Sequence, residues 1–254
     1  MPDGADPRGR ARWLLTDAGG EIPPAKVREA KELEPALLDL ARAGDPIAQT
    51  LVGAIAMVVR RKPKDARRWF EQAAGLGEPA AKRSLGFLYA NGMGVKRDVP
   101  KAWALLREAA DAGDLYAMYN LVGINTGADG AYASFEESLR LLDAPVAAGM
   151  VPAMVLRADL LARVDRDEEA VELYRRAAGL GHSGAMHALG AWARDGIVGP
   201  PDRVEAVHWF LRQAAAGDRD GFKSAKELAR TMTTDEITEA AARAETPELG
   251  ARLR

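Results

Sequence analysis

Glycines at a nearly fixed spacing constrain this chain more than any other feature. Each of them follows an apolar segment with helical periodicity, so each is predicted to end a helix. Successive glycines are 33, 36, 36, 32 and 36 residues apart. A period in this range is typical of arrays of helix pairs, in which each repeat buries its apolar face against its neighbours. The six positions are Gly44, Gly77, Gly113, Gly149, Gly181 and Gly217.

Bulky and small residues recur at fixed distances from these glycines. The eighth and seventh positions before each of the last five glycines carry large apolar side chains, which we interpret as core and not as a ligand site. The eleventh position before and the fourth position after carry small ones. Glycine within a helix costs about 1 kcal/mol relative to alanine, so the ninth-position glycines predict that a neighbouring helix approaches closely. The bulky pairs are Trp69 and Phe70, Leu105 and Leu106, Leu141 and Leu142, Leu173 and Tyr174, and Trp209 and Phe210; the ninth-position glycines are Gly53, Gly86 and Gly190.

These columns predict an all-α chain organised as one solenoid of helix-turn-helix repeats. No long stretch alternates apolar and polar residues, which argues against strands. We expect a flexible N-terminal arm (1–24), a solenoid (25–245) and a frayed tail (246–254). Pro145 and the larger ninth-position residues Val122 and Ala158 predict a bend near the middle. The solenoid divides into a capping helix (25–44), repeats 45–77, 78–113, 114–149, 150–181 and 182–217, and a C-terminal cap (218–245).

Composition excludes several classes of protein. The chain has no cysteine, which removes disulfides, thiolate chemistry and cysteine-ligated zinc. With 35 basic and 37 acidic side chains, no field of the whole protein attracts nucleic acid or an anionic membrane. The first twenty residues hold no long apolar run, so neither a signal peptide nor a membrane span is predicted, and a cytoplasmic location is expected.

The repeat pattern resembles the Sel-one-like repeat, a relative of the tetratricopeptide repeat. The repeat that ends at Gly113 carries the pattern most fully, in Ala81, Leu85, Gly86, Tyr89, Gly92, Gly94, Val95, Asp98, Lys101, Ala102, Ala109 and Ala110. The repeat that ends at Gly217 keeps Leu189, Gly190, Gly196, Asp202, Trp209 and Phe210. The resemblance covers roughly residues 45–228. It implies an α/α right-handed superhelix that serves as an adaptor, and it implies no shared catalytic residue.

Candidate chemical motifs favour structural roles over catalysis. His182 and His187 are five residues apart, a poor spacing for one helical face, and His208 belongs to another helix, so no metal site is predicted. The acidic run from Asp165 to Glu169 lacks the glycine and the distal glutamate of a calcium loop, and acids stabilise a helix start. The glycines around Met93 lack the lysine and hydroxyl residue of a phosphate-binding loop.

One strongly charged run stands apart from the rest of the chain. It is interpreted first as a solvated helix end, where cations favour the carboxyl dipole. The alternative is a docking patch for an acidic partner. Nucleic acid is disfavoured because no aromatic residues alternate with the charges. The run comprises Arg60, Arg61, Lys62, Lys64, Arg67 and Arg68.

The first helices of such an array line a concave face that holds peptides or partner domains. In tetratricopeptide units this face is built from the sixth, tenth and thirteenth positions after the ending glycine. The corresponding candidate residues are Arg83, Phe87, Tyr119, Asp159, His187 and Arg194. We therefore predict a non-catalytic adaptor that binds a protein or peptide, not nucleic acid or a membrane, without cofactor or metal, as a monomer or weak dimer. The alternatives are a cytoplasmic immunity or inhibitor protein that neutralises a cognate toxin by binding it and, less favoured, an enzyme.

Overall fold

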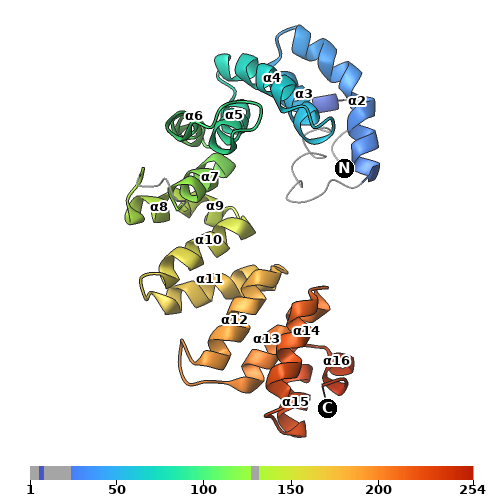
Figure 1. Ribbon diagram of the computed structural model, residues 1–254, viewed down its shortest axis with the longest axis vertical. Helices are drawn as coiled ribbons and strands as arrows, with labels where there is room; N and C mark the ends of the chain where they lie inside the picture. Colours follow the sequence, from blue (N-terminus) through green and yellow to red (C-terminus); the bar gives the residue numbers. More distant parts are fainter. Residues whose placement is uncertain (1–5, 9–23, 127–131, 254) are drawn as a thin grey trace. The chain divides into compact units, whose positions relative to one another are not determined.

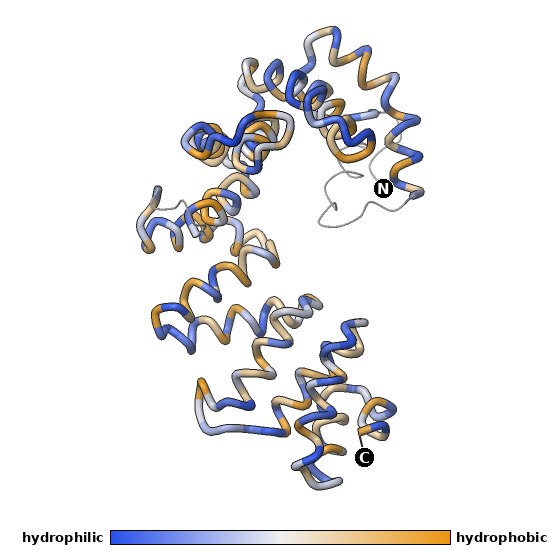
Figure 2. The backbone as a smooth tube through the Cα atoms, in the orientation of Figure 1, coloured by the Kyte–Doolittle hydropathy of each residue, from blue (hydrophilic) through white to orange (hydrophobic). Residues whose placement is uncertain are grey.

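The computed structural model describes residues 6–8, 24–126 and 132–253, and every regular element in these ranges is a helix. The predicted all-α class is therefore confirmed. Apolar and polar residues alternate with helical spacing along the elements (Figure 2), so that helices bury one face and expose the other. The chain forms two compact units, residues 1–141 and 142–254.

In the first unit, consecutive helices pack against each other as antiparallel pairs, and α5 also contacts α7 (Figure 1). Each repeat contributes a first helix and a second helix. The first helices begin after an N-cap whose side chain accepts a backbone N–H in α3 and α7, which satisfies a donor that the helix leaves unpaired. The helices of this unit are α2 (Pro24–Arg42), α3 (Pro46–Val58), α4 (Pro63–Gly75), α5 (Pro79–Asn91), α6 (Val99–Asp111), α7 (Leu115–Asn125) and α8 (Phe135–Leu141).

The second unit follows the same plan of successive helix pairs. In its predicted C-terminal cap, α15 begins after the N-cap residue Thr233, whose hydroxyl and backbone N–H form a capping box with Glu236. The helices are α9 (Asp143–Ala147), α10 (Val151–Ala162), α11 (Asp167–Gly179), α12 (Ser183–Asp195), α13 (Arg203–Ala215), α14 (Arg219–Ala229), α15 (Thr234–Arg243) and α16 (Pro247–Ala251).

The helix-ending glycines adopt the left-handed conformation that the sequence predicts. All six have φ between 80° and 95°, where a side chain would be strained, and each lies two residues after the last residue of a helix. The regular spacing of these glycines in the sequence is therefore the spacing at which the chain ends one helix pair and begins the next.

The glycines within the first helices lie where the second helix of the same repeat packs closely, as the sequence predicts. A Cβ atom added to Gly53 would lie 2.6 Å from the ring of Phe70, and one added to Gly190 would lie 2.6 Å from the ring of Phe210. A Cβ on Gly86 would lie 2.8 Å from Cγ of Leu106. The first helix of a repeat thus receives the bulky seventh-position residue of its own second helix. Those bulky residues are at most 5% exposed: Phe70, Leu106, Leu142, Tyr174 and Phe210.

The second helix of the third repeat is interrupted where the sequence holds a proline. The α8 helix ends at Leu141 and α9 begins at Asp143, and the two helices belong to different units. Pro145 lies in the first turn of α9, where its missing N–H costs no helical hydrogen bond. The same missing N–H cannot bond the carbonyl of Leu141, which explains why one continuous helix does not form.

The structure describes little of the N-terminal arm but nearly all of the C-terminal residues. Most of the predicted flexible arm (1–24) lies outside the described residues, but the guanidinium of Arg8 bonds Asp45 at 2.8 Å. At the other end, the predicted frayed tail (246–254) requires correction, because residues 247–251 form α16. Leu249 packs on the core of the second unit, and Gly250 sits so close to α15 that a Cβ would meet Ala241 at 2.3 Å.

Candidate functional site

Two hollows adjoin each other on the first helices of the first unit. One has a volume of about 350 Å³ and is lined mainly by α3 and α5, and the other has a volume of about 340 Å³ and is lined mainly by α5 and α7. They share Phe87 and Asn120. We refer to the two hollows together as the groove.

The groove follows the repeat register. Positions six, ten and thirteen after an ending glycine lie on one face of a helix, since they are four and three residues apart. Each hollow is lined by the tenth and thirteenth residues of one repeat and by the sixth and tenth residues of the next. The residues that obey this rule are Ala54, Met57, Arg83 and Phe87 in the first hollow and Phe87, Ala90, Tyr119 and Gly123 in the second.

Phe87 stands at the centre of the groove with 45% of its surface exposed. Exposed aromatic rings in a concave surface mark sites of apolar contact, because a ring left in water forgoes the free energy of burial. Val58, which lines the first hollow, is also exposed. The groove is therefore apolar at its middle.

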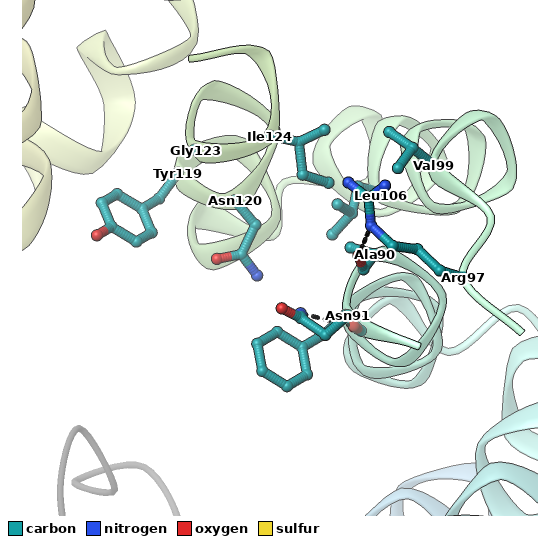
Figure 3. Close-up of a pocket in the computed structure, with 10 residues that line it drawn as sticks. Ala90, Asn91, Arg97, Val99, Leu106, Tyr119, Asn120, Gly123 and Ile124 are labelled. Carbon is teal, nitrogen blue, oxygen red and sulfur yellow. Dashed lines mark hydrogen bonds between the residues drawn. The ribbon is translucent and has the colours of Figure 1, made fainter. Parts of the chain in front are cut away.

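Asparagine amides face each other across the second hollow (Figure 3). Asn91 and Asn120 point toward one another from α5 and α7. Nδ2 of Asn91 donates to the carbonyl of Phe87 at 2.9 Å, whereas the amide of Asn120 makes no hydrogen bond with another residue in the described part of the chain. An asparagine amide carries both donors and an acceptor and so matches a peptide group of an extended chain.

Sequence reasoning missed seven of the lining residues named above: Ala54, Met57, Val58, Ala90, Asn91, Asn120 and Gly123. The signal for Ala54 and Met57 was present, since they occupy the tenth and thirteenth positions of the first repeat. Their small or aliphatic side chains gave no chemical reason to select them. Asn91 and Asn120 lie one residue outside these columns, so only the structure identifies them.

The other two predicted site residues of the first unit, Arg83 and Tyr119, contact neighbouring residues of the fold. Nε of Arg83 lies 3.0 Å from Oδ2 of Asp114, and its guanidinium lies 5.3 Å from the ring centre of Tyr116. Asp114 also caps α7 by accepting the N–H of Ala117. Arg83 thus ties the second repeat to the third and borders the groove. Tyr119 is half-buried and lines the second hollow.

Asp159 lies on α10 and His187 and Arg194 lie on α12, in the second unit, whereas the groove is formed by helices of the first unit. Asp159 accepts the hydroxyl of Tyr174 at 2.5 Å, and burial together with this bond raises the pKa of Tyr174. This partner gives Asp159 a structural role.

The two remaining predicted residues also contact neighbours. Nδ1 of His187 lies 3.3 Å from Oε1 of the buried Gln213. Arg194 pairs with Asp195 at 2.7 Å and lowers the pKa of that carboxyl. Both side chains remain exposed.

Within the predicted basic run, two arginines form ion pairs with other described residues, and the remaining cations form none with them. Arg60 forms an ion pair at 2.7 Å with Glu34, a carboxylate that is only 5% exposed. Arg67 lies 3.6 Å from Glu71 along the same helix. The other members of the run are exposed: Arg61, Lys62, Lys64 and Arg68.

The remaining motifs have structural roles. His182 caps α12, its Nδ1 accepting the N–H of Ala185, and His208 is half-buried beside Trp209. Acids from Asp167 onward occupy the first turn of α11. Within the described ranges no three histidine, aspartate or glutamate side chains are grouped so that they could hold a metal ion. No described helix combines the length and the apolar character that crossing a membrane requires.

Comparison with known proteins supports the repeat assignment. The Sel1 repeat model, which describes the Sel-one-like repeat, matches residues 51–78, 79–114, 161–182 and 183–218. Two repeats matched over 36 residues are the two that the sequence pattern marks most fully.

Solved structures share the fold. A protective antigen of uropathogenic Escherichia coli strains with an SLR fold matches 97% of this chain with a TM-score of 0.77 and 21% identity, and this chain spans 55% of that one. A Sel1 repeat protein from Oxalobacter formigenes matches 90% of this chain and 100% of its own length, with a TM-score of 0.66 and 21% identity. An immunity protein from Pseudomonas aeruginosa reaches a TM-score of only 0.44 at 17% identity, which supports no functional argument.

Four matched repeats, the helix pairs of both units and the shared fold of these structures lead to one conclusion. The chain carries four Sel1 repeats.

Proposed function

We propose that this protein is a non-catalytic scaffold that holds an extended segment of a partner protein in the groove of its first unit. The observation that carries the proposal is the register of the two hollows, which recurs from one repeat to the next around Phe87. Sel1 repeat proteins are typically interaction scaffolds, which agrees with this role.

The chemistry of the groove fits an extended peptide. Successive side chains of an extended chain point to opposite sides, so two adjoining hollows suit side chains two residues apart. The exposed ring of Phe87 separates the two hollows and offers apolar contact to both. The amide of Asn120 borders both hollows as well and offers hydrogen bonds to the peptide backbone.

Gly123 allows a specific test. It lies in α7 and lines the second hollow, and a Cβ added there would meet nothing within 4 Å. Leucine at this position is expected to fill the hollow without displacing any residue of the fold. Gly179 in α11 has the same open surroundings and lines neither hollow, so Gly179→Leu is the matched control.

The experiment begins with peptides selected on the wild-type protein from a displayed random library. Their affinities are then measured by fluorescence anisotropy. Gly123→Leu is expected to weaken binding by about tenfold or more, because the loss of one buried side-chain contact is worth roughly 1 to 3 kcal/mol. Gly179→Leu is expected to leave the affinity unchanged. Equal binding to both variants would show that the groove is not the site.

The immunity alternative is separated by the identity of a natural partner. Affinity capture with wild type and Gly123→Leu as bait is expected to yield partners that differ between the two. A single stoichiometric partner whose enzymatic activity falls on binding, captured equally by both baits, would assign the protein to the inhibitor class instead.

A further inference from the structure

The loop that follows the first helix of the second repeat lies against the start of the second helix of the first repeat. The chain between α5 and α6 passes through Gly94, which has φ +70°. A Cβ atom at Gly94 would lie 2.8 Å from the carbonyl carbon of Pro63 and 2.9 Å from the backbone nitrogen of Lys64. This loop therefore rests directly on the start of α4, and only glycine permits this approach.

This contact brings two basic segments together. Residues 60–68 and 96–101 contain nine cationic and two acidic side chains, although the net charge of the whole chain is −2. The sequence shows the first segment as a run, but it does not show that the second lies beside it. We call the two segments the basic loop surface. Its cations are Arg60, Arg61, Lys62, Lys64, Arg67, Arg68, Lys96, Arg97 and Lys101.

Most of this charge is not neutralised by the fold. Glu34 offsets Arg60, and Asp98 is occupied as the N-cap of α6, where it accepts the N–H of Lys101 at 3.0 Å. Asp65 is the other acid of the surface, and it is exposed. Five cations form no ion pair with any residue that the structure describes: Arg61, Lys62, Lys64, Arg68 and Lys96.

A hollow of about 580 Å³ opens between the two segments. Arg67 lines it from α4, and Lys96, Arg97 and Asp98 line it from the loop. Guanidinium and ammonium groups that face one hollow bind carboxylates with charge-assisted hydrogen bonds. The fold thus gathers cationic side chains around a concave surface, among them Lys96, which forms no ion pair with a described residue.

We propose that the basic loop surface binds an acidic segment of a partner protein, rich in aspartate and glutamate. The rings at the hollow are already engaged, since Tyr132 stacks on Trp103 with ring centres 5.2 Å apart and Tyr89 bonds Lys101 through its hydroxyl at 2.8 Å. They are therefore not available as stacking platforms for bases, which disfavours single-stranded nucleic acid. The surface adjoins the groove, since Arg97 and Val99 line hollows of both, but Lys62, Lys64 and Lys96 lie outside the groove.

The test uses a fluorescein-labelled peptide of about ten glutamates and the matching glutamine peptide as neutral probe. The variant is Lys62→Gln, Lys64→Gln and Lys96→Gln together, all exposed residues outside the groove. The control is Arg28→Gln, Lys31→Gln and Arg42→Gln on α2, which changes the net charge equally. Circular dichroism verifies that all three proteins keep their helical content.

Wild type is expected to bind the glutamate peptide, more weakly as salt is raised, and to ignore the glutamine peptide. The loop variant is expected to bind about tenfold more weakly and the α2 control less than about twofold more weakly. Equal losses in the two variants would overturn the proposal, because net charge alone would then explain binding. Tighter binding of a single-stranded oligonucleotide or of phosphatidylserine vesicles through the same three lysines would overturn it as well.

Discussion

The second and fifth repeats (78–113 and 182–217) share one skeleton in two separate units. In each, a glycine of the first helix faces the bulky residue of the second: Gly86 faces Leu106, and Gly190 faces Phe210. Glycines with φ of 67° and 69° end the first helices, at Gly92 and Gly196. Asp98 and Asp202 cap the second helices.

The same two repeats differ at positions whose side chains do not take part in packing between the two helices. The tenth position is the exposed Phe87 in one and Ala191 in the other. The loop after the first helix is basic in the second repeat, whereas that of the fifth exposes Ile197 and Val198. Packing therefore specifies the spacing of the small and bulky residues. The exposed positions, which do not contribute to that packing, are available to specify partners.

The largest expected effect comes from removing the bulky side chain of the skeleton. Phe210→Ala is expected to lower the free energy of unfolding by roughly 3 to 5 kcal/mol, because a buried ring is lost and a cavity remains. Since repeat arrays need not unfold in one step, hydrogen exchange is the measurement. Protection is expected to fall mainly in α12, α13 and α14.

Leu106→Ala is the counterpart in the second repeat, with an expected loss of roughly 2 to 5 kcal/mol. Its loss of protection is expected in α5, α6 and α7. If either variant instead lowered protection uniformly over both units, the expectation that each substitution acts mainly on its own and the adjoining helices would be contradicted.

A smaller effect is expected from filling the gap that receives the bulky residue. Gly190→Val is expected to cost about 1 to 3 kcal/mol, because its side chain would overlap the ring of Phe210. Gly179→Val makes the same change at a position where an added Cβ would have no atom within 4 Å. It is expected to alter the free energy of unfolding by less than about 1 kcal/mol. Urea denaturation followed by circular dichroism compares the two. Similar costs would mean that close approach does not explain the glycine column.

The fold was predictable because its determinants are periodic. The ending glycines and the small and bulky columns each recur at a fixed position, so several copies of one signal support the same assignment. The positions of Phe87 and Gly123 in the groove follow from the same register. The amide of Asn120 and the junction of the two basic segments did not follow, because each depends on a contact between repeats, through α5 and α7 or through Gly94 and Pro63.

The smallest expected effect is a pH dependence confined to the fifth repeat. His208 occupies the position that Ala104 holds in the second repeat. Burial lowers the pKa of His208; Arg212 and Arg243 lower it further, while Glu205 and a hydrogen bond with the backbone of Arg243 oppose the shift. A folded pKa below the unfolded value means that the unfolded chain binds the proton more tightly. The stability contributed by neutral His208 is therefore present above the unfolded pKa of about 6.5 and is lost as the pH falls through it.

Melting temperatures at about pH 7.5 and pH 5.5 test this prediction, since carboxyl groups titrate mostly below this window. Wild type is expected to lose more stability between the two values than His208→Gln. Ala104→His places a histidine at the corresponding position of the second repeat, but Ala104 is exposed and a histidine there would keep its hydration. This variant is therefore expected to show the pH dependence of wild type and no more. A pH response of His208→Gln equal to that of wild type would show that burial of His208 does not contribute, and that the two repeats do not differ in this respect.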